Sequence, residues 1–202
     1  MENTTNYVEL HGIPAEEPRF SHYGGGESFY IFPLNVARLS GAVDRINVVV
    51  SGADVSALDI ADFARRDVDV TGELRSFNNT RGTGSRLVIT VLARQLSLSQ
   101  NPDKNLVALS GSLCKKPNLR QTPLGSTICD LMLAVPRHSG RSDYIPCIAW
   151  NRTAQLASEL SAGDAVSLEG RIQSRKYAKT EPDGTSSEHT AFEVSIKALE
   201  RE

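Results

Sequence analysis

The segment Asp143-Tyr-Ile-Pro-Cys-Ile-Ala-Trp-Asn151 decides the fold of this chain. Its side chains alternate with the period of two that is typical of a β-strand. The small and aliphatic residues share one face: Ile145, Cys147 and Ala149. The opposite face carries two aromatic rings, Tyr144 and Trp150. We therefore expect a strand with one buried side and one aromatic side.

A second strand of the same kind follows a short helical segment, in Ala165-Val-Ser-Leu-Glu-Gly-Arg-Ile-Gln-Ser-Arg-Lys-Tyr177. Its apolar face runs from Val166 to Ile172. The opposite face carries polar and aromatic side chains: Arg171, Gln173, Arg175 and Tyr177. Rings on which bases can stack, set among cations that hold phosphates, are what single-stranded nucleic acid requires. The alternative is that Trp150 is a core residue and the arginines are only solvated.

Composition limits the class of protein. The 202 residues allow one or two domains, and 40% hydrophobic with 23% charged residues is typical of a globular chain. No apolar run approaches the roughly 20 residues of a membrane span, and the polar N-terminus lacks a signal-peptide pattern. The three cysteines form no C-x-x-C pair. We therefore expect a cytoplasmic protein without disulfides, zinc or membrane contact.

Charge does not point to nucleic acid by itself. The net charge is −2. Residues 1–100 hold nine arginines, no lysine and twelve acids, and residues 101–202 hold thirteen basic and twelve acidic residues. Because neither half is strongly basic, any nucleic-acid site must rest on a local arrangement of cations.

The chain contains an internal duplication. Val107-Ala-Leu-Ser-Gly111 repeats Val8-Glu-Leu-His-Gly12 at a spacing of 99 residues. Other pairs at this spacing are Pro18 and Pro117, Arg38 and Arg137, and Asp44 and Asp143. Past the helical segment the spacing is 98, from Gly72 to Gly170. A nearly constant spacing indicates two repeats. We expect domains at residues 1–100 and 105–202, joined by a polar linker at 101–104.

Each repeat follows the order strand, strand, strand, helix, strand, strand. In the first repeat we expect strands at residues 7–12, 28–38, 45–51, 68–77 and 86–98, with a helix over 57–66. Gly12 and Gly111 lie within strands, where glycine often marks a barrel corner. The order predicts a mainly β protein of two tandem OB-folds, which are five-stranded Greek-key barrels. A small β-sandwich is the alternative.

Several motifs of the second repeat carry a family resemblance: Pro117-Asn-Leu-Arg-Gln-Thr-Pro-Leu-Gly125, Leu133-Ala-Val-Pro-Arg137, Asp143-Tyr-Ile-Pro-Cys-Ile-Ala-Trp150 and Leu168-Glu-Gly-Arg-Ile-Gln-Ser-Arg-Lys-Tyr177. With them, nearly all of residues 105–199 resembles the bacterial single-stranded DNA-binding protein family. The resemblance implies a barrel, not an enzyme, that wraps single-stranded DNA in replication, recombination and repair. It implies a nucleoid-associated protein of the bacterial cytoplasm, and it implies that Tyr144, Trp150 and Tyr177 stack on bases.

The cations around these rings are the expected phosphate contacts, with Gln173 among them on the same face: Arg120, Arg137, Arg152, Arg171, Arg175 and Lys176. The first repeat departs from this pattern, with Arg45 in place of Tyr144 and Ser51 in place of Trp150. It keeps a smaller set of candidates: Arg38, Arg45, Arg75 and Phe77. We expect the first repeat to bind DNA weakly or to serve mainly in assembly.

Relatives in this family usually assemble four barrels, so we expect a homodimer of two-barrel chains. The chain ends at Leu199-Glu-Arg-Glu202 without the acidic tail that recruits repair proteins, which makes tail-mediated partners doubtful. We expect no catalytic centre, metal or cofactor, because the four histidines are scattered and Asp130 with Glu169 is too little for a nuclease. The alternative function is a primosome-type scaffold whose OB-folds mainly bind proteins.

Overall fold

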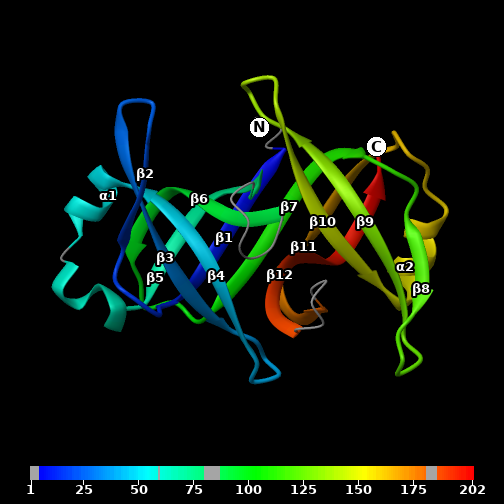
Figure 1. Ribbon diagram of the computed structural model, residues 1–202, viewed down its shortest axis with the longest axis horizontal. Helices are drawn as coiled ribbons and strands as arrows, with labels where there is room; N and C mark the ends of the chain where they lie inside the picture. The colour runs from blue at the N-terminus through cyan, green and yellow to red at the C-terminus, as the bar shows by residue number, and fades with distance from the viewer. Residues whose placement is uncertain (1–4, 59, 80–86, 181–185) are drawn as a thin grey trace. The chain divides into compact units, whose positions relative to one another are not determined.

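The chain forms two compact units in a computed structural model that describes residues 5–58, 60–79, 87–180 and 186–202 (Figure 1). The side chains of residues 60–62, 177, 179, 180, 187 and 189 also lie outside this description. By contacts, unit 1 comprises Met1–Arg75 and Thr90–Leu109, and unit 2 comprises Ser76–Ile89 and Ser110–Glu202. The limits 1–100 and 105–202, which come from the repeat, stay a prediction.

Unit 1 is a closed barrel with one added hairpin strand. Its elements are β1 (Asn6–Pro14), β2 (Arg19–Gly24), β3 (Glu27–Ala37), β4 (Val43–Ser51), α1 (Gly52–Ala57), the 3-10 helix η1 (Ile60–Arg65), β5 (Val68–Asn78) and β6 (Leu87–Leu98). The end of β5 from Ser76 and the start of β6 up to Ile89 belong to unit 2. The strands are ordered β2-β3-β4-β6-β5-β1, and pairing of β1 with β3 closes the barrel. Strands β4 and β6 run parallel.

Unit 2 repeats this design. Its elements are β7 (Lys104–Leu113), β8 (Asn118–Gln121), β9 (Thr127–Pro136), β10 (Ser142–Trp150), α2 (Asn151–Ser158), β11 (Ala165–Thr180) and β12 (Ser186–Arg201). The order is β7-β11-β12-β10-β9-β8, with β7–β9 as the closing pair and β10–β12 as the parallel pair. The predicted tandem OB-folds, with a helix after the third barrel strand, are confirmed.

Strand β7 explains why the boundary between the two units, after Leu109, differs from the boundary at residue 105 that the repeat predicts. Its first residues, from Lys104 to Leu109, pair antiparallel with β1 inside unit 1. In this pairing Val8 lies opposite Val107, its own counterpart in the repeat. The strand then continues into unit 2, where Ser112 pairs with Ala134. The segment predicted as the start of the second domain therefore packs with the first unit.

The predicted inward face of β10 is confirmed. Ile145, Cys147 and Ala149 are all buried in the core of unit 2. Ile148, on the predicted outer face, is buried as well. On that face, Ile148 near the middle of the strand is buried, while the rings of Tyr144 and Trp150 near its two ends are exposed. Position along a central strand, and not only the face, thus decides exposure.

The helix of unit 1 does not follow the prediction. The expected helix over residues 57–66 is replaced by α1, which begins at Gly52, and by the separate 3-10 helix η1. The Ser51 hydroxyl accepts a hydrogen bond from the Asp54 backbone N–H at 3.1 Å, which is an N-cap. Leu58 has extended backbone angles and ends α1. The cap at Ser51 is the sequence signal that the prediction overlooked.

The mid-strand glycines allow the first strand of each barrel to close it. A Cβ atom on Gly111 would lie 2.3 Å from the carbonyl oxygen of Ala134, and one on Gly12 would lie 2.2 Å from that of Asn35. Both carbonyls belong to the strands that close the barrels, β9 and β3. Any larger residue would push the two backbones apart at this crossing, so glycine is required there.

We predict that Gly111→Ala lowers the free energy of unfolding by about 1–3 kcal/mol, because the added methyl overpacks against a backbone atom that cannot turn aside. Gly24→Ala is the matched control, since its Cβ would meet nothing closer than 3.5 Å. Urea unfolding followed by circular dichroism measures both variants. Equal midpoints for Gly111→Ala and Gly24→Ala would contradict the close approach.

Candidate nucleic-acid interface

The aromatic rings predicted to stack on bases stand at the two ends of β10. Tyr144 is 52% exposed and Trp150 is 37% exposed. The chain turns directly after Trp150 into α2, with Asn151 in the left-handed region at φ 49°. Asparagine tolerates this conformation better than most residues. Trp150 is therefore not a core residue, and both rings are accessible on one strand.

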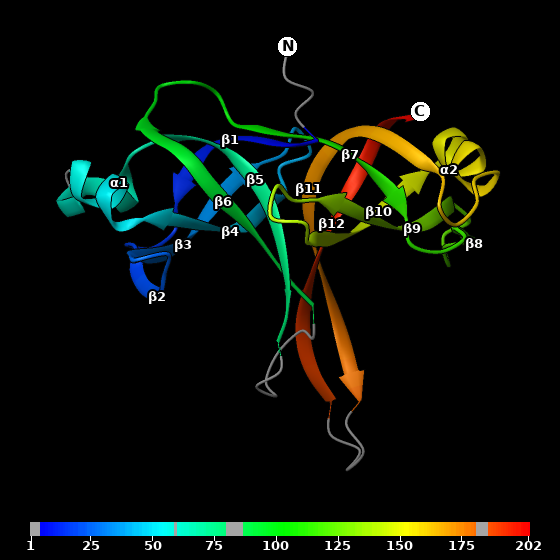
Figure 2. The same cartoon turned by 90° about the horizontal axis from the view of Figure 1, so that it is seen from above.

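The third predicted ring lies on β11, which pairs with β12 along a long ribbon. The backbone of Tyr177 lies opposite His189 in this pairing. Figure 2 shows the ribbon of β11 and β12 running out beyond the barrel. The Tyr177 side chain lies outside what the structure describes, so its stacking role stays a prediction.

The polar face of β11 is organised by hydrogen bonds. The Gln173 amide donates to the Glu193 carboxylate at 2.8 Å, and Arg171 donates to the Gln173 amide oxygen at 3.1 Å. Gln173 is buried, so it positions Arg171 more than it offers a contact. Further along, Arg175 is exposed. The exposed Lys176 pairs with Glu188 at 2.8 Å, a hydrogen bond that raises the Lys176 pKa.

Two other predicted cations differ in their surroundings. Arg120 on β8 pairs with Asp130 on β9 at 2.5 Å, and this hydrogen bond raises the Arg120 pKa. Arg152 on α2 is exposed, and no hydrogen bond or ion pair joins it to another described residue. Exposed ion pairs contribute about 0–1 kcal/mol. A phosphate can therefore compete for Arg120 and Lys176, while Arg152 is available without any exchange.

Arg137 is engaged in a buried network and not only at the surface. Its Nε donates to Asp143 Oδ2 at 2.6 Å, and Asp143 is fully buried. The Ser76 backbone N–H donates to Asp143 Oδ1 at 2.6 Å, and Arg137 Nη2 donates to the Ser76 carbonyl at 3.2 Å. The Tyr144 N–H donates to the Ser76 hydroxyl at 2.7 Å. The network thus holds the backbone of Tyr144 in place.

The first repeat contains the same ion pair. Arg38 Nε donates to Asp44 Oδ2 at 2.6 Å, Asp44 is fully buried, and this hydrogen bond raises the Arg38 pKa. The spacing of arginine and aspartate that the two repeats share therefore corresponds to a structural ion pair. For Arg38 and Arg137 this pairing is a role that sequence reasoning missed.

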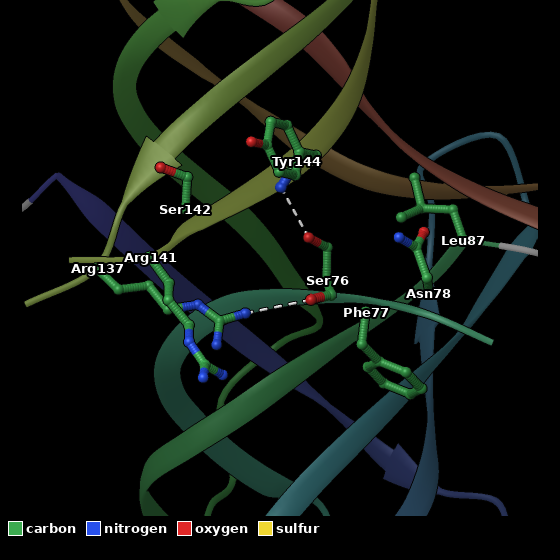
Figure 3. A pocket seen from close by; sticks show the side chains of 8 residues that line it. All are labelled: Ser76, Phe77, Asn78, Leu87, Arg137, Arg141, Ser142 and Tyr144. Carbon is green, nitrogen blue, oxygen red and sulfur yellow. Dashed lines mark hydrogen bonds between the residues drawn. The ribbon is translucent and has the colours of Figure 1, made fainter. Parts of the chain in front are cut away.

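A pocket of about 280 Å³ adjoins this network in unit 2 (Figure 3). Its lining comes from β5, β6, β10 and the turn before β10: Ser76, Phe77, Asn78, Leu87, Arg137, Arg141, Ser142 and Tyr144. Phe77, predicted as a weak site of the first repeat, here lies with Tyr144 and is 53% exposed. Sequence reasoning missed Arg141 and Ser76, which belong to none of the family motifs.

The remaining candidates of the first repeat face acids. Arg45 pairs with Glu16, and Arg75 pairs with Glu73, which also accepts from Arg94. Unit 1 also carries an aromatic cluster on β2 and β3 that the sequence analysis did not identify. Its ring pairs are Phe20 with Tyr23 at 4.9 Å, Phe20 with Tyr30 at 6.0 Å and His22 with Phe29 at 5.1 Å. The acids that pair with Arg45 and Arg75 weaken these two arginines as phosphate contacts.

In the described part of the chain, no group of three or more His, Cys, Asp or Glu side chains could hold a metal ion. Cys129 and Cys147 are buried, and burial raises the pKa of the Cys147 thiol. Within the same residues, no helix has the length and apolar character needed to cross a membrane.

Known proteins resemble this chain in both sequence and fold. The model of the family described as "Single-strand binding protein family" matches residues 104–201. Single-stranded DNA-binding protein A of Bacillus subtilis (strain 168) is 40% identical over 80 residues, which are 36% of this chain and 46% of that protein. Single-stranded DNA-binding protein B of the same organism is 39% identical over 84 residues, which are 38% of this chain and 74% of that protein.

The chain spans about half the length of several curated relatives that it matches, protein A of Bacillus subtilis among them. The crystal structure of the wild-type single-stranded DNA binding protein from Thermus aquaticus matches with a TM-score of 0.77 and 24% identity. The match covers 98% of this chain and 92% of that one, so the two-barrel fold is shared. By its match to protein B and to the family model, the chain belongs to the single-strand binding protein family.

Proposed function

We propose that the protein binds single-stranded DNA without sequence preference and protects it during replication, recombination and repair. It acts as a binding protein in the bacterial cytoplasm, associated with the nucleoid, and not as an enzyme. The observation that carries the proposal is the pair of exposed rings, Tyr144 and Trp150, at the two ends of one strand. The names of the matched relatives, single-stranded DNA-binding proteins, support it.

The energetics follow from the surroundings of each group. Stacking contributes about 1–3 kcal/mol per base and tolerates any base, because every base has a π-face. Arg152 offers a phosphate contact directly, and Arg120 and Lys176 exchange a surface carboxylate for a phosphate. These local contacts can bind phosphates although the chain as a whole has a net charge of −2. Affinity then rests on rings first and cations second.

Two chains supply four barrels, the number that the family resemblance implies, so we propose a homodimer. Unit 1 keeps the barrel and its buried ion pair but pairs Arg45 and Arg75 with acids. We therefore propose that unit 1 contributes less to DNA binding than unit 2.

We predict that oligo-dT quenches the fluorescence of Trp150, the one tryptophan in the sequence. Trp150→Ala and Tyr144→Ala should each weaken binding by about 1–3 kcal/mol, which is roughly 5- to 150-fold. Trp150→Phe is the matched control, because it keeps a ring for stacking. Fluorescence anisotropy of labelled oligo-dT measures all three variants. No quenching of Trp150 by oligo-dT, together with no loss of affinity in the alanine variants, would favour the scaffold function over DNA binding.

The salt dependence tests the cations. Arg152→Gln should reduce the slope of log K against log salt concentration by about 0.7, the contribution of one phosphate contact on a single strand. Arg201→Gln is the control, since Arg201 pairs with Asp164 and is not among the proposed DNA contacts. Titrations from low to high salt give both slopes. A slope that falls equally in the two variants would argue against a specific role for Arg152.

The assembly is tested by light scattering at micromolar concentration. One chain has a mass of 22.0 kDa. We expect a mass of two chains, because two barrels per chain then give four barrels. A mass of a single chain would overturn the homodimer.

A further inference from the structure

We propose that the pocket beside Ser76 holds one nucleotide unit of the bound strand, with the base on Phe77 and Tyr144 and the phosphate on Arg141. This inference deepens the proposed function and rests on it. It assigns a place to Arg141, which no sequence motif identified, and it gives Phe77 a role in the site of unit 2.

The charges in the pocket select Arg141 as the phosphate ligand. Arg137 already binds the buried Asp143 through Nε and Nη2, so its charge is balanced within the fold. Arg141 is exposed, and no hydrogen bond or ion pair joins its side chain to another described residue. Figure 3 shows the two guanidinium groups side by side at one end of the pocket. An anion placed there receives charge-assisted hydrogen bonds from Arg141.

The rest of the lining fits a base. Tyr144 and Phe77 lie on opposite sides of Ser76 in Figure 3, and both rings are about half exposed. Asn78 and Ser142 add polar groups at the rim, which can meet the polar edge of a base. The volume of about 280 Å³ is just below the usual range of ligand pockets, so the pocket suits a single nucleotide unit of a strand and not a larger ligand.

The pocket is held open by the fold. Ser76 makes contacts to Asp143, Arg137 and Tyr144 through its N–H, its carbonyl and its hydroxyl. These contacts anchor the strand that carries Phe77 to the strand that carries Tyr144. Binding therefore needs little ordering of the backbone, which favours affinity.

The test uses the full chain with labelled oligo-dT. Phe77→Ala should weaken binding roughly tenfold, the scale of one stacked base, with the salt slope unchanged. Arg141→Gln should weaken binding and lower the salt slope by about 0.7. Lys197→Gln, which removes an exposed cation outside the pocket, should do neither. All three positions are exposed, and thermal melting checks that each variant folds.

Photocross-linking adds a direct measurement. Oligo-dT carrying 5-iododeoxyuridine should cross-link to Phe77 or Tyr144 in wild type, located by mass spectrometry. Titration with thymidine monophosphate distinguishes a strand from a free nucleotide, and we expect no saturation at micromolar concentration. Tight binding of the free nucleotide that depends on Arg141 would overturn the assignment to a strand.

The outcomes separate the two proposals. If oligo-dT quenches Trp150 normally, while Phe77→Ala and Arg141→Gln change neither affinity nor slope and no cross-link reaches the pocket, the pocket assignment is overturned and DNA binding stands. If wild type does not bind oligo-dT at all, the proposed function falls together with the pocket.

Discussion

The buried carboxylate of Asp143 is the constraint on which the binding face depends. A charged group buried away from water must be paired and hydrogen-bonded, because otherwise its burial destabilises the fold by several kcal/mol. Arg137 supplies the opposite charge from the far side of the β9–β10 turn, and the Ser76 N–H supplies a further donor from β5. Satisfying one carboxylate therefore holds the part of β5 at Ser76, which belongs to unit 2, against the strand that carries the rings.

The arginines differ in whether their guanidinium groups are already paired with an acid. Arg137 stabilises the fold, because its guanidinium is bound to a buried acid. Arg152 and Arg141 remain exposed, without a partner among the described residues. Between these extremes, Arg120 is held only by an exposed ion pair that a phosphate can replace. In a chain with a net charge of −2, the environment of each guanidinium, more than the number of cations, decides which arginines are open to an anion.

The two repeats share the same barrel architecture but differ in the side chains on the outer face. Both repeats keep a closing glycine, Gly12 or Gly111, and a buried ion pair, because barrel closure and burial of the aspartate impose the same geometry twice. No such geometry constrains the outer face. There the first repeat has Arg45 and Ser51 where the second has Tyr144 and Trp150. It carries an aromatic cluster on β2 and β3 instead.

The sequence by itself determined the duplication, the two barrels and the strand face that carries Tyr144 and Trp150, because repeat spacing and strand periodicity can be read directly along the chain. Only the tertiary structure decided that Arg137 is bound to Asp143, that Phe77 lines a pocket with Tyr144, and that residues 104–109 pack with the first unit. The physical reason is distance along the chain. Ser76 and Asp143 are 67 residues apart, and no local pattern shows which donor will reach a buried carboxylate.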